Sequence, residues 1–505
     1  MASQPKLKKK ATTNARGFVF NGAYGGVIAE GFAVSKPLPG HNPDELPEHT
    51  FATAQIASGR WARNPAGDLY YWTGSHWQVV EDAELASDAY VWLGEHFPNC
   101  AGDAKAQLCL RTLKRTHVLL PKQQTKRMVI ACQDYYLEIV NDGARHKVVR
   151  IEPDPTMGYT SCVPVSVGGR AGQEYTFGSA KANPYFENFL SVSLPQMDVR
   201  EVVQKYIGYT MIPPSVMNLS IALVMVGAGA DGKGVISNLT RRILHSASSM
   251  ALDFGSKDGF AFEGIENGIS LAVVDELPIN EAIASKDIKT AISGDPMSIN
   301  RKGRKRLSVR PTARFMICGN SLPRFDHGGA AALRRRFLFV PFPARLGETE
   351  RANNLEDRIV EDEAQAFFDW ALQGALMIVK ERCFDFNKLP AVCRKMSGDT
   401  MEASDQTLGF MKEFGVKVSY EHTMLKDDIY ADYVEWTTSS GQKPLAASNF
   451  YARLLANLRV ETIDAGRENS GKRRRKVYIT YDLGAPTAEE IKAEYPAGHP
   501  FTKEA

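Results

Sequence analysis

The sequence lacks a long apolar run, although the chain has 505 residues. Its most apolar stretch, residues 221–226, is far shorter than the roughly 18 residues of a transmembrane helix. Near the start, basic residues are followed by Thr12, Thr13 and Asn14, where a secretory signal would need an apolar segment. We therefore expect a cytoplasmic protein with no membrane partner and no export signal.

Cysteine is scarce and does not occur in metal-binding patterns. The seven cysteines are an odd number, no two of them form a C-x-x-C pair, and no Cys/His spacing matches a zinc knuckle. The pattern argues against a disulfide framework and against structural zinc. It indicates a reduced, intracellular protein.

An excess of charge of one sign is also missing, because 61 Lys and Arg face 58 Asp and Glu, for a net charge of +3. Any contact with a nucleic acid must then depend on local clusters. The chain is 44% apolar, 10% aromatic and 24% charged, which is typical of folded globular domains. Its length allows two to four domains and excludes a single small binding module.

The order of apolar patterns predicts an α/β protein with accessory domains. Residues 68–77 predict an aromatic hairpin, residues 81–96 a helix, and residues from about 200 to 345 alternating strands and helices. Residues 355–381 predict a further helical segment. We expect a flexible basic leader (1–50), an α+β accessory domain (51–195), the α/β core (196–345), a helical extension (346–400), a C-terminal domain (401–485) and a tail (486–505).

Residues 227–234 fit the phosphate-loop pattern G-x-x-x-x-G-K, between the apolar run and a predicted helix over 235–244. Backbone amides of such a loop face phosphate oxygens, and Lys233 would reach the β- and γ-phosphates of ATP. Gly234 replaces the usual Ser or Thr ligand of Mg²⁺, and Ser237 is a weak substitute. The alternative is a structural turn. The candidate nucleotide-binding residues are Gly227, Ala228, Gly229, Ala230, Asp231, Gly232, Lys233 and Gly234.

Two further apolar strands end in polar residues. Asp275 and Glu276 follow a β-branched run; Asp275 would hold Mg²⁺, and Glu276 would polarise the water that attacks the γ-phosphate. Asn320 ends the strand over 314–319 and would orient that water. The alternatives are a solvated acidic turn and an Asn that caps a turn.

Three arginines, residues 334–336, enter another apolar strand. Arg335 or Arg336 would neutralise charge that develops on phosphate, and such an arginine acts on a neighbouring subunit only within a ring. The alternative is a basic surface patch.

Residues 297–309 predict two short strands around a Gly turn with five cations close together. Such a cluster repels itself unless it faces a polyanion. The alternative is a solvated basic loop. The cations are Arg301, Lys302, Arg304, Lys305 and Arg306.

The C-terminal region predicts a helix over 445–458 with Ser448 as its cap, a strand over 459–463, a basic segment and a strand over 477–482. This order is typical of a winged helix with a basic wing that binds DNA. A protein-docking module is the alternative. The wing cations are Lys472, Arg473, Arg474 and Arg475.

Taken in order, these motifs resemble superfamily 3 helicases, and specifically the phage, plasmid and poxvirus-type primase-helicase family. The resemblance covers roughly residues 55–485. It depends on the aromatic hairpin with Trp72 and Trp77, the phosphate loop, and the segments at 183–186, 206–209, 275–278, 293–296, 319–323 and 335–342.

The resemblance implies an AAA+ type ATPase that uses ATP and Mg²⁺ and forms a hexameric ring on single-stranded and forked DNA. It implies Asn320 as the sensor, Arg335 or Arg336 as the finger, Lys302 on the DNA backbone, and 3′ to 5′ translocation. The protein would be a replicative DNA helicase of a phage, plasmid or other mobile element in a bacterial host cell. The alternative is an origin-binding ATPase or loader ring with little unwinding activity.

A priming polymerase, which relatives often carry, needs clustered carboxylates. Glu152 and Asp154 are the best candidates, but the two neighbouring prolines favour a polar turn. We therefore expect a helicase without its own primase that works with a separate primase or polymerase.

Overall fold

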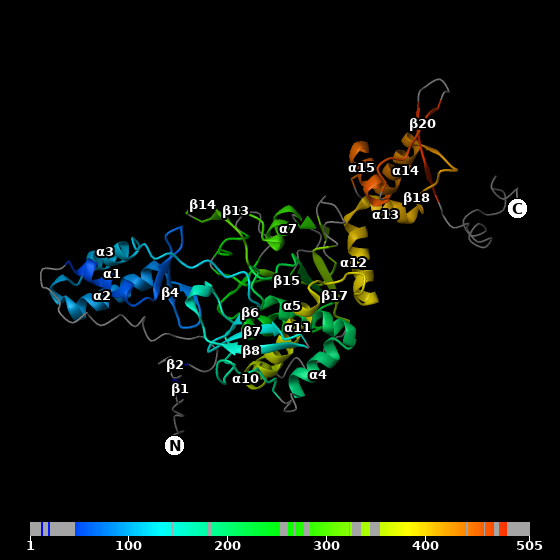
Figure 1. Cartoon of the computed structure of the whole chain (residues 1–505). Helices are drawn as coiled ribbons and strands as arrows, with labels where there is room; N and C mark the ends of the chain where they lie inside the picture. Colours follow the sequence, from blue (N-terminus) through cyan, green and yellow to red (C-terminus); the bar gives the residue numbers. More distant parts are fainter. Residues whose placement is uncertain are drawn as a thin grey trace, which may run out of the picture. The chain divides into compact units, whose positions relative to one another are not determined.

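The computed structural model describes residues 12–13, 19–20, 46–143, 145–178, 184–252, 261–266, 268–276, 282–283, 285–302, 304–322, 324–325, 335–343, 354–440, 443–458, 460–468 and 474–481. The chain divides into two compact units (Figure 1). The first comprises Met1–Glu281, Lys286–Leu322 and Arg336–Arg394, and the second comprises Ala282–Ser285, Pro323–Arg335 and Lys395–Ala505. Among the described helices, none is long and apolar enough to cross a bilayer.

The first unit begins with an α+β portion that has its own core. Helices α1 (Pro47–Ala57), α2 (Asp82–His96) and α3 (Asp103–Leu113) accompany the antiparallel sheet β3 (Trp61–Arg63), β4 (Leu69–Trp72) and β5 (Trp77–Val79). The predicted aromatic hairpin is confirmed, because Trp72 pairs with Trp77. Helix α1 starts at Pro47, three residues before the expected end of the leader.

A second antiparallel sheet follows, and two helices connect it to the core. Its strands are β6 (Val129–Ala131), β7 (Tyr136–Asn141) and β8 (His146–Ile151). The helices are α4 (Pro184–Ser193) and α5 (Met197–Thr210), and α5 is the helix predicted near 200–212. Short β1 (Thr12–Thr13) and β2 (Val19–Phe20) pair with each other near the start of the chain.

A five-stranded parallel sheet forms the centre of the first unit. Its strands are β9 (Ala222–Val226), β10 (Ser249–Ala251), β11 (Leu271–Val274), β15 (Arg314–Gly319) and β17 (Phe337–Pro341). They lie in the order β10-β11-β15-β9-β17, so β9, the first of these strands in the sequence, is flanked by the last two, β15 and β17. Strands β9 and β11 are fully buried, and the predicted α/β core is confirmed.

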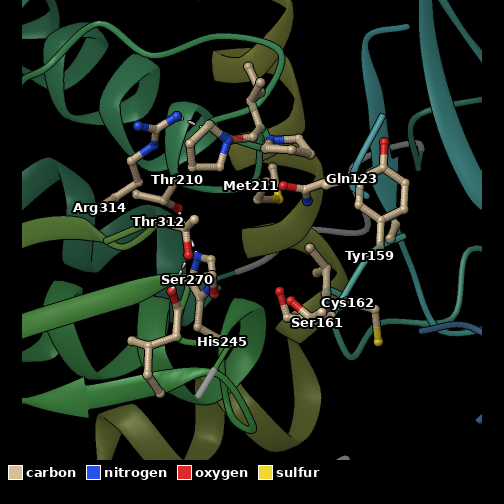
Figure 2. Close-up of a pocket in the computed structure, with 18 residues that line it drawn as sticks. Gln123, Tyr159, Ser161, Cys162, Thr210, Met211, His245, Ser270, Thr312 and Arg314 are labelled. Carbon is tan, nitrogen blue, oxygen red and sulfur yellow. Dashed lines mark hydrogen bonds between the residues drawn. The ribbon is translucent and has the colours of Figure 1, made fainter. Parts of the chain in front are cut away.

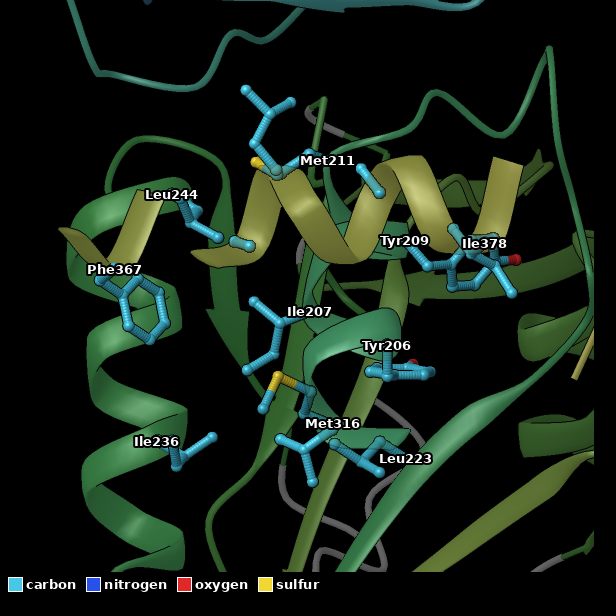
Figure 3. Close-up of a cluster of buried hydrophobic side chains, with 14 of the residues drawn as sticks. Tyr206, Ile207, Tyr209, Met211, Leu223, Ile236, Leu244, Met316, Phe367 and Ile378 are labelled. Atoms are coloured by element: carbon cyan, nitrogen blue, oxygen red, sulfur yellow. The ribbon is translucent and has the colours of Figure 1, made fainter. Parts of the chain in front are cut away.

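Helix α5 crosses α11 (Ala364–Glu381) at close range beside this sheet (Figure 3). A Cβ atom at Gly208 would collide with the backbone nitrogen of Ala375, and one at Gly374 would collide with the carbonyl of Gln204. The two glycines therefore let the helix backbones touch. Tyr206 is buried at the same place and donates to the carbonyl of Phe315 in β15 at 2.7 Å, which ties α5 to the sheet.

The predicted helical segment over 355–381 is two helices, because α10 (Leu355–Asp362) ends just before Glu363. The Glu363 carboxylate is 6% exposed and accepts hydrogen bonds from the backbone amides of Tyr185 and Phe186 in the first turn of α4. The break thus places the Glu363 carboxylate where it accepts hydrogen bonds from two amides of the first turn of α4, which have no partner within their own helix.

The remaining elements of the core include the predicted basic hairpin. Helix α6 (Lys233–Leu239) continues into a π-helical turn, Thr240–Leu244, and α7 (Ser285–Ser293) precedes the hairpin. Strands β13 (Met297–Arg301) and β14 (Arg304–Val309) pair antiparallel with Met297 opposite Val309, so the hairpin is confirmed.

From Gln406 on, the described elements of the second unit follow the order helix, two short strands, two helices and three strands. They are α13 (Gln406–Glu413), β18 (Lys417–Val418), β19 (Met424–Leu425), α14 (Lys426–Ser439), α15 (Ala447–Leu458), β20 (Asp464–Glu468), β21 (Arg474–Val477) and β22 (Ile479–Thr480). The antiparallel sheet order is β19-β21-β20, and β18 pairs with β22. Short β12 (Ala282–Ile283) pairs with β16 (Arg324–Phe325). Helix α12 (Ala391–Ser404) spans the division between the units.

The expected cap of α15 is wrong. Ser448 lies inside the first turn, because the helix starts at Ala447 and Ala446 O accepts the first helical bond.

Candidate functional site

The carboxyl ends of three neighbouring strands bring the predicted residues to one edge of the sheet. The phosphate loop follows β9, Asp275 follows β11, and Asn320 follows β15, which lies between them. Together they line a cleft of about 880 Å³, a size that suits a nucleotide. It is lined by residues 229–235, Asn238, Arg241, Asp275, Glu276, Cys318, Asn320 and residues 354–357.

The phosphate loop has an unusual backbone conformation. Gly229, Ala230 and Gly232 all have positive φ (96°, 54° and 95°), a conformation that turns successive amide groups toward a common anion. A Cβ at Gly232 would collide with Ser193. Glycine is therefore required there both by the backbone angle and by the approach of α4.

Lys233 and Asp231 form a buried ion pair within this loop. The ammonium of Lys233 lies 2.9 Å from Asp231 Oδ2 and also donates to the carbonyl of Gly227 at 3.2 Å. The side chains are 10% and 2% exposed. The Asp231 carboxylate also accepts from the amides of Gly229 and Lys233. It thus holds the loop together through the donors that a phosphate would use.

The acidic pair and the amide face the cleft from the next two strand ends. Asp275, Glu276 and Asn320 are all exposed. The Asn320 amide donates to Glu276 Oε1 at 3.4 Å. An acid and an amide that share one space can position a water molecule between them.

The carboxylates of the cleft fit Mg²⁺ only when the phosphates of a bound nucleotide supply further ligands. Within the described part of the chain no three His, Cys, Asp or Glu side chains converge as a metal site. Mg²⁺ commonly binds through one or two carboxylates plus substrate phosphates, and Asp275 beside the phosphate loop suits that arrangement.

The structure corrects the expectation for Ser237. Its side chain is 0% exposed, does not line the cleft, and lies near Cys318, whose thiol pKa is raised to about 12 by burial. Ser237 is buried toward the core, whereas the next residue, Asn238, lines the cleft. It cannot supply the missing hydroxyl.

Sequence reasoning missed one wall of the cleft. Arg241 lies beside Asp275, with Nη1 at 3.3 Å from Oδ2, and Asn238 donates to Glu356 at 2.9 Å. Arg242 holds Glu356 and Asp357 at 2.7 and 2.8 Å. These contacts bring the start of α10 to the cleft, and no local motif predicts them.

Arg336 lies at the opposite edge of the sheet from the phosphate loop. It precedes β17, and its Nε donates to Ser293 Oγ at 3.2 Å. The five residues of β17 span roughly 16 Å at 3.3 Å per residue. Arg336 therefore cannot reach the cleft of its own chain. Arg335 is exposed.

The structure describes only some of the other predicted basic residues, those of the hairpin and of the wing. Lys302 and Arg306 are exposed on the hairpin, and the Lys302 backbone amide donates to Glu263 at 2.7 Å. Arg301 is partly buried in β13. The side chains of Arg304, Lys305, Arg474 and Arg475 lie outside the described residues, as do Lys472 and Arg473 entirely.

A second, smaller pocket lies at the amino edge of the sheet (Figure 2). His245 is 2% exposed, and its ring lies 2.9 Å from Thr210 Oγ1 and 2.8 Å from Ser270 Oγ. Because Thr210 already donates to Ile207, His245 Nε2 donates to Thr210 and Nδ1 accepts from Ser270. Burial lowers the His245 pKa to about 3. The ring is thus neutral and engaged within the fold.

Comparison with known proteins yields distant matches. A model for a family of unknown function (DUF5906) matches residues 225–336, from β9 to Arg336. No curated protein matches. The apo structure of the NrS-1 C-terminal region is 10% identical, with a TM-score of 0.45 over 87% of this chain and 100% of that chain. Its A form is 11% identical, with a TM-score of 0.45 over 85% and 99%. A JCV helicase with a bound small molecule is 15% identical, with a TM-score of 0.26 over 46% of this chain and 65% of that chain.

Proposed function

We propose that the protein is an ATP-driven DNA helicase with an AAA+ type core. The observation that carries the proposal is the single cleft in which Lys233, Asp275, Glu276 and Asn320 meet at the carboxyl edge of the parallel sheet. A phosphate-binding lysine, a metal-binding acid, a base and a polar sensor are the parts that NTP hydrolysis requires. The strand order, with β9 between β15 and β17, suits the same class of motor.

Each residue has a role that its position allows. Lys233 leaves Asp231 to contact the β- and γ-phosphates, while the loop amides hold the phosphate oxygens. Asp275 would hold Mg²⁺, which neutralises phosphate charge when bound. Glu276 accepts a proton from the attacking water, and Asn320 holds that water in line with the γ-phosphate.

The ring assembly and the DNA contacts belong to the same proposal. Arg336 lies too far from its own cleft to act there, so it, or Arg335, serves the cleft of a neighbouring copy in a hexameric ring. The hairpin β13–β14 carries Lys302 and its neighbouring cations to the phosphate backbone of single-stranded DNA, without reading bases. We propose translocation from 3′ to 5′, as the family resemblance implies.

The second unit is proposed to dock DNA as a winged helix. Its order of α13, β19, α14, α15, β20 and β21, with a three-stranded antiparallel sheet, suits that fold. The basic segment between β20 and β21 would be the wing. A separate primase or polymerase would supply primers, and a mobile element in a bacterial host would be the source of the DNA.

The test is DNA-stimulated ATP hydrolysis by the full chain. We expect wild type to hydrolyse ATP faster with single-stranded DNA and Lys233→Ala to lose at least about 100-fold in rate, because the phosphate charge is no longer neutralised. Absence of hydrolysis in both proteins would refute the motor.

Gly234 favours a second candidate, an origin-binding ATPase or loader ring with little unwinding activity. Without a hydroxyl at this position, Mg²⁺ has one protein ligand fewer. Slow hydrolysis together with stable DNA-bound rings and no strand separation would favour this candidate.

A further inference from the structure

The guanidinium of Arg241 lies beside Asp275, the acid that is proposed to hold Mg²⁺. Its Nη1 lies 3.3 Å from Asp275 Oδ2, and its Nη2 lies 2.5 Å from Asn238 Oδ1. The side chain is 29% exposed and lines the same cleft as the phosphate loop. Asn238 therefore holds one terminal nitrogen of the guanidinium, and the group lines the cleft beside the phosphate loop.

Helix geometry explains how Arg241 reaches that place. Gly234 and Asn238 lie four residues apart on one face of α6, and Arg241 lies in the π-helical turn that continues it. All three residues line the cleft. Side chains on a helix tilt toward its N-terminus, which directs Arg241 past Asn238 toward Gly234. A Cβ at Gly234 would meet nothing within 4 Å, so this path is open.

The neighbouring Arg242 shows what a purely structural arginine does here. It contacts two carboxylates, Glu356 at 2.7 Å and Asp357 at 2.8 Å, and joins the helix to α10. Arg241 instead shares the single carboxylate of Asp275, whose side chain is 54% exposed. A guanidinium with one exposed acid can add a bidentate contact to a polyphosphate.

We propose that Arg241 is a second cation for nucleotide binding within the same chain, in addition to Lys233. It contacts phosphate oxygens of a nucleoside triphosphate from the side of Asp275. Its positive charge thereby compensates for the weaker Mg²⁺ binding that follows from the missing hydroxyl at Gly234. The inference rests on the proposed nucleotide site and predicts that binding depends only weakly on Mg²⁺.

The experiment is a fluorescence titration of the full chain with a fluorescent ATP analogue, once with Mg²⁺ and once with EDTA. We expect wild type to bind in EDTA within about tenfold of its affinity in Mg²⁺. Arg241→Gln should lose at least about tenfold in EDTA, because one charge-assisted contact is removed. Arg241→Lys should recover part of the loss. Arg111→Gln, which removes an exposed arginine of α3 that does not line the cleft, is the control and should bind like wild type.

Gly234→Ser provides an independent variant, since its side chain enters open space. Its affinity in Mg²⁺ relative to that in EDTA should rise, because the added hydroxyl supplies a ligand to the metal. Equal or tighter binding of Arg241→Gln in EDTA would overturn the inference, because Arg241 would then only block Asp275. If the Arg241 effect appears without any ATP hydrolysis by wild type, the motor fails and this inference stands.

Discussion

At the scale of single residues, the ion pair between Lys233 and Asp231 holds the phosphate loop in the conformation described above. The two side chains are almost fully buried and lie 2.9 Å apart. A triphosphate bound as we propose would need the same ammonium and the same loop amides that now contact the Asp231 carboxylate. The negative charge of Asp231 therefore opposes the charge of an incoming nucleotide.

Asp231→Asn tests this competition. The amide keeps the shape and one acceptor but removes the like charge, so we expect the affinity for ATP to rise by about tenfold. The unfolding temperature without nucleotide should fall, because Lys233 loses its buried partner. A titration with ATP and a thermal melt measure both effects. Asp399→Asn, on an exposed site of α12, is the control; unchanged or weaker ATP binding by Asp231→Asn would contradict the competition.

The sequence alone could predict the site residues that come shortly after an apolar strand. Asp275 and Asn320 each follow an apolar strand directly, and Lys233 ends the loop that follows β9; parallel strands bring such positions together. The start of α10 reaches the cleft through the contact between Arg242 and Glu356, which lie more than a hundred residues apart, and no local pattern encodes that contact. Arg241 is placed by its contacts with Asn238 and Asp275. Ser237 was misplaced because one residue of helical rotation decides between core and cleft.

At the scale of elements, the crossing of α5 and α11 fixes the helix layer beside the sheet. Gly208 and Gly374 face each other's helix with no room for a Cβ. The pattern of apolar residues predicted both helices but could not predict this crossing. It also could not predict the break at Glu363, since the reason for the break is a helix start about 180 residues earlier.

Gly208→Ala should destabilise the first unit. An added methyl group must push two helix backbones apart, at a cost of about 1–3 kcal/mol. Gly94→Ala, in α2 where a Cβ meets nothing within 4 Å, should instead stabilise by about 0.5–1 kcal/mol because alanine favours the helix. Urea unfolding of both variants measures the difference. Equal effects would contradict the close crossing.

Lys302→Ala tests the role of the hairpin β13–β14. The variant should lose unwinding of a forked duplex while it retains most of its ATP hydrolysis without DNA, because Lys302 lies on the hairpin and not among the residues that line the cleft. Lys388→Ala, an exposed lysine outside the hairpin, is the control. Strand separation by Lys302→Ala at the wild-type rate would exclude the hairpin as the element that moves DNA.

At the scale of the whole molecule, the net charge of +3 averages over regions of opposite sign. Cations concentrate at residues 301–306, 334–336 and 472–476, and acids accumulate in helical segments such as 355–381. A ring needs positive potential in its pore and at its docking domain, not over its whole surface. If Arg336 or Arg335 acts in the cleft of a neighbouring copy, as we propose, assembly is part of the chemistry.

Mixing two inactive variants tests that assembly. Lys233→Ala retains its arginines, and Arg336→Ala, or Arg335→Ala if that variant is the inactive one, retains its cleft. Random mixing in a ring should restore about a quarter of the wild-type hydrolysis, because a working cleft then meets a neighbour's arginine at that frequency. No recovery in rings of normal size would show that the arginine does not act between subunits.

The central claim is that ATP hydrolysis in this cleft separates DNA strands. The most direct measurement is unwinding of a forked duplex by wild type and by Lys233→Ala, with ATP and Mg²⁺, on forks that carry only a 3′ or only a 5′ single-stranded arm. We predict ATP-dependent unwinding by wild type on the fork with the 3′ arm and none by Lys233→Ala. No unwinding by wild type on either fork, or equal unwinding by both proteins, would contradict the claim.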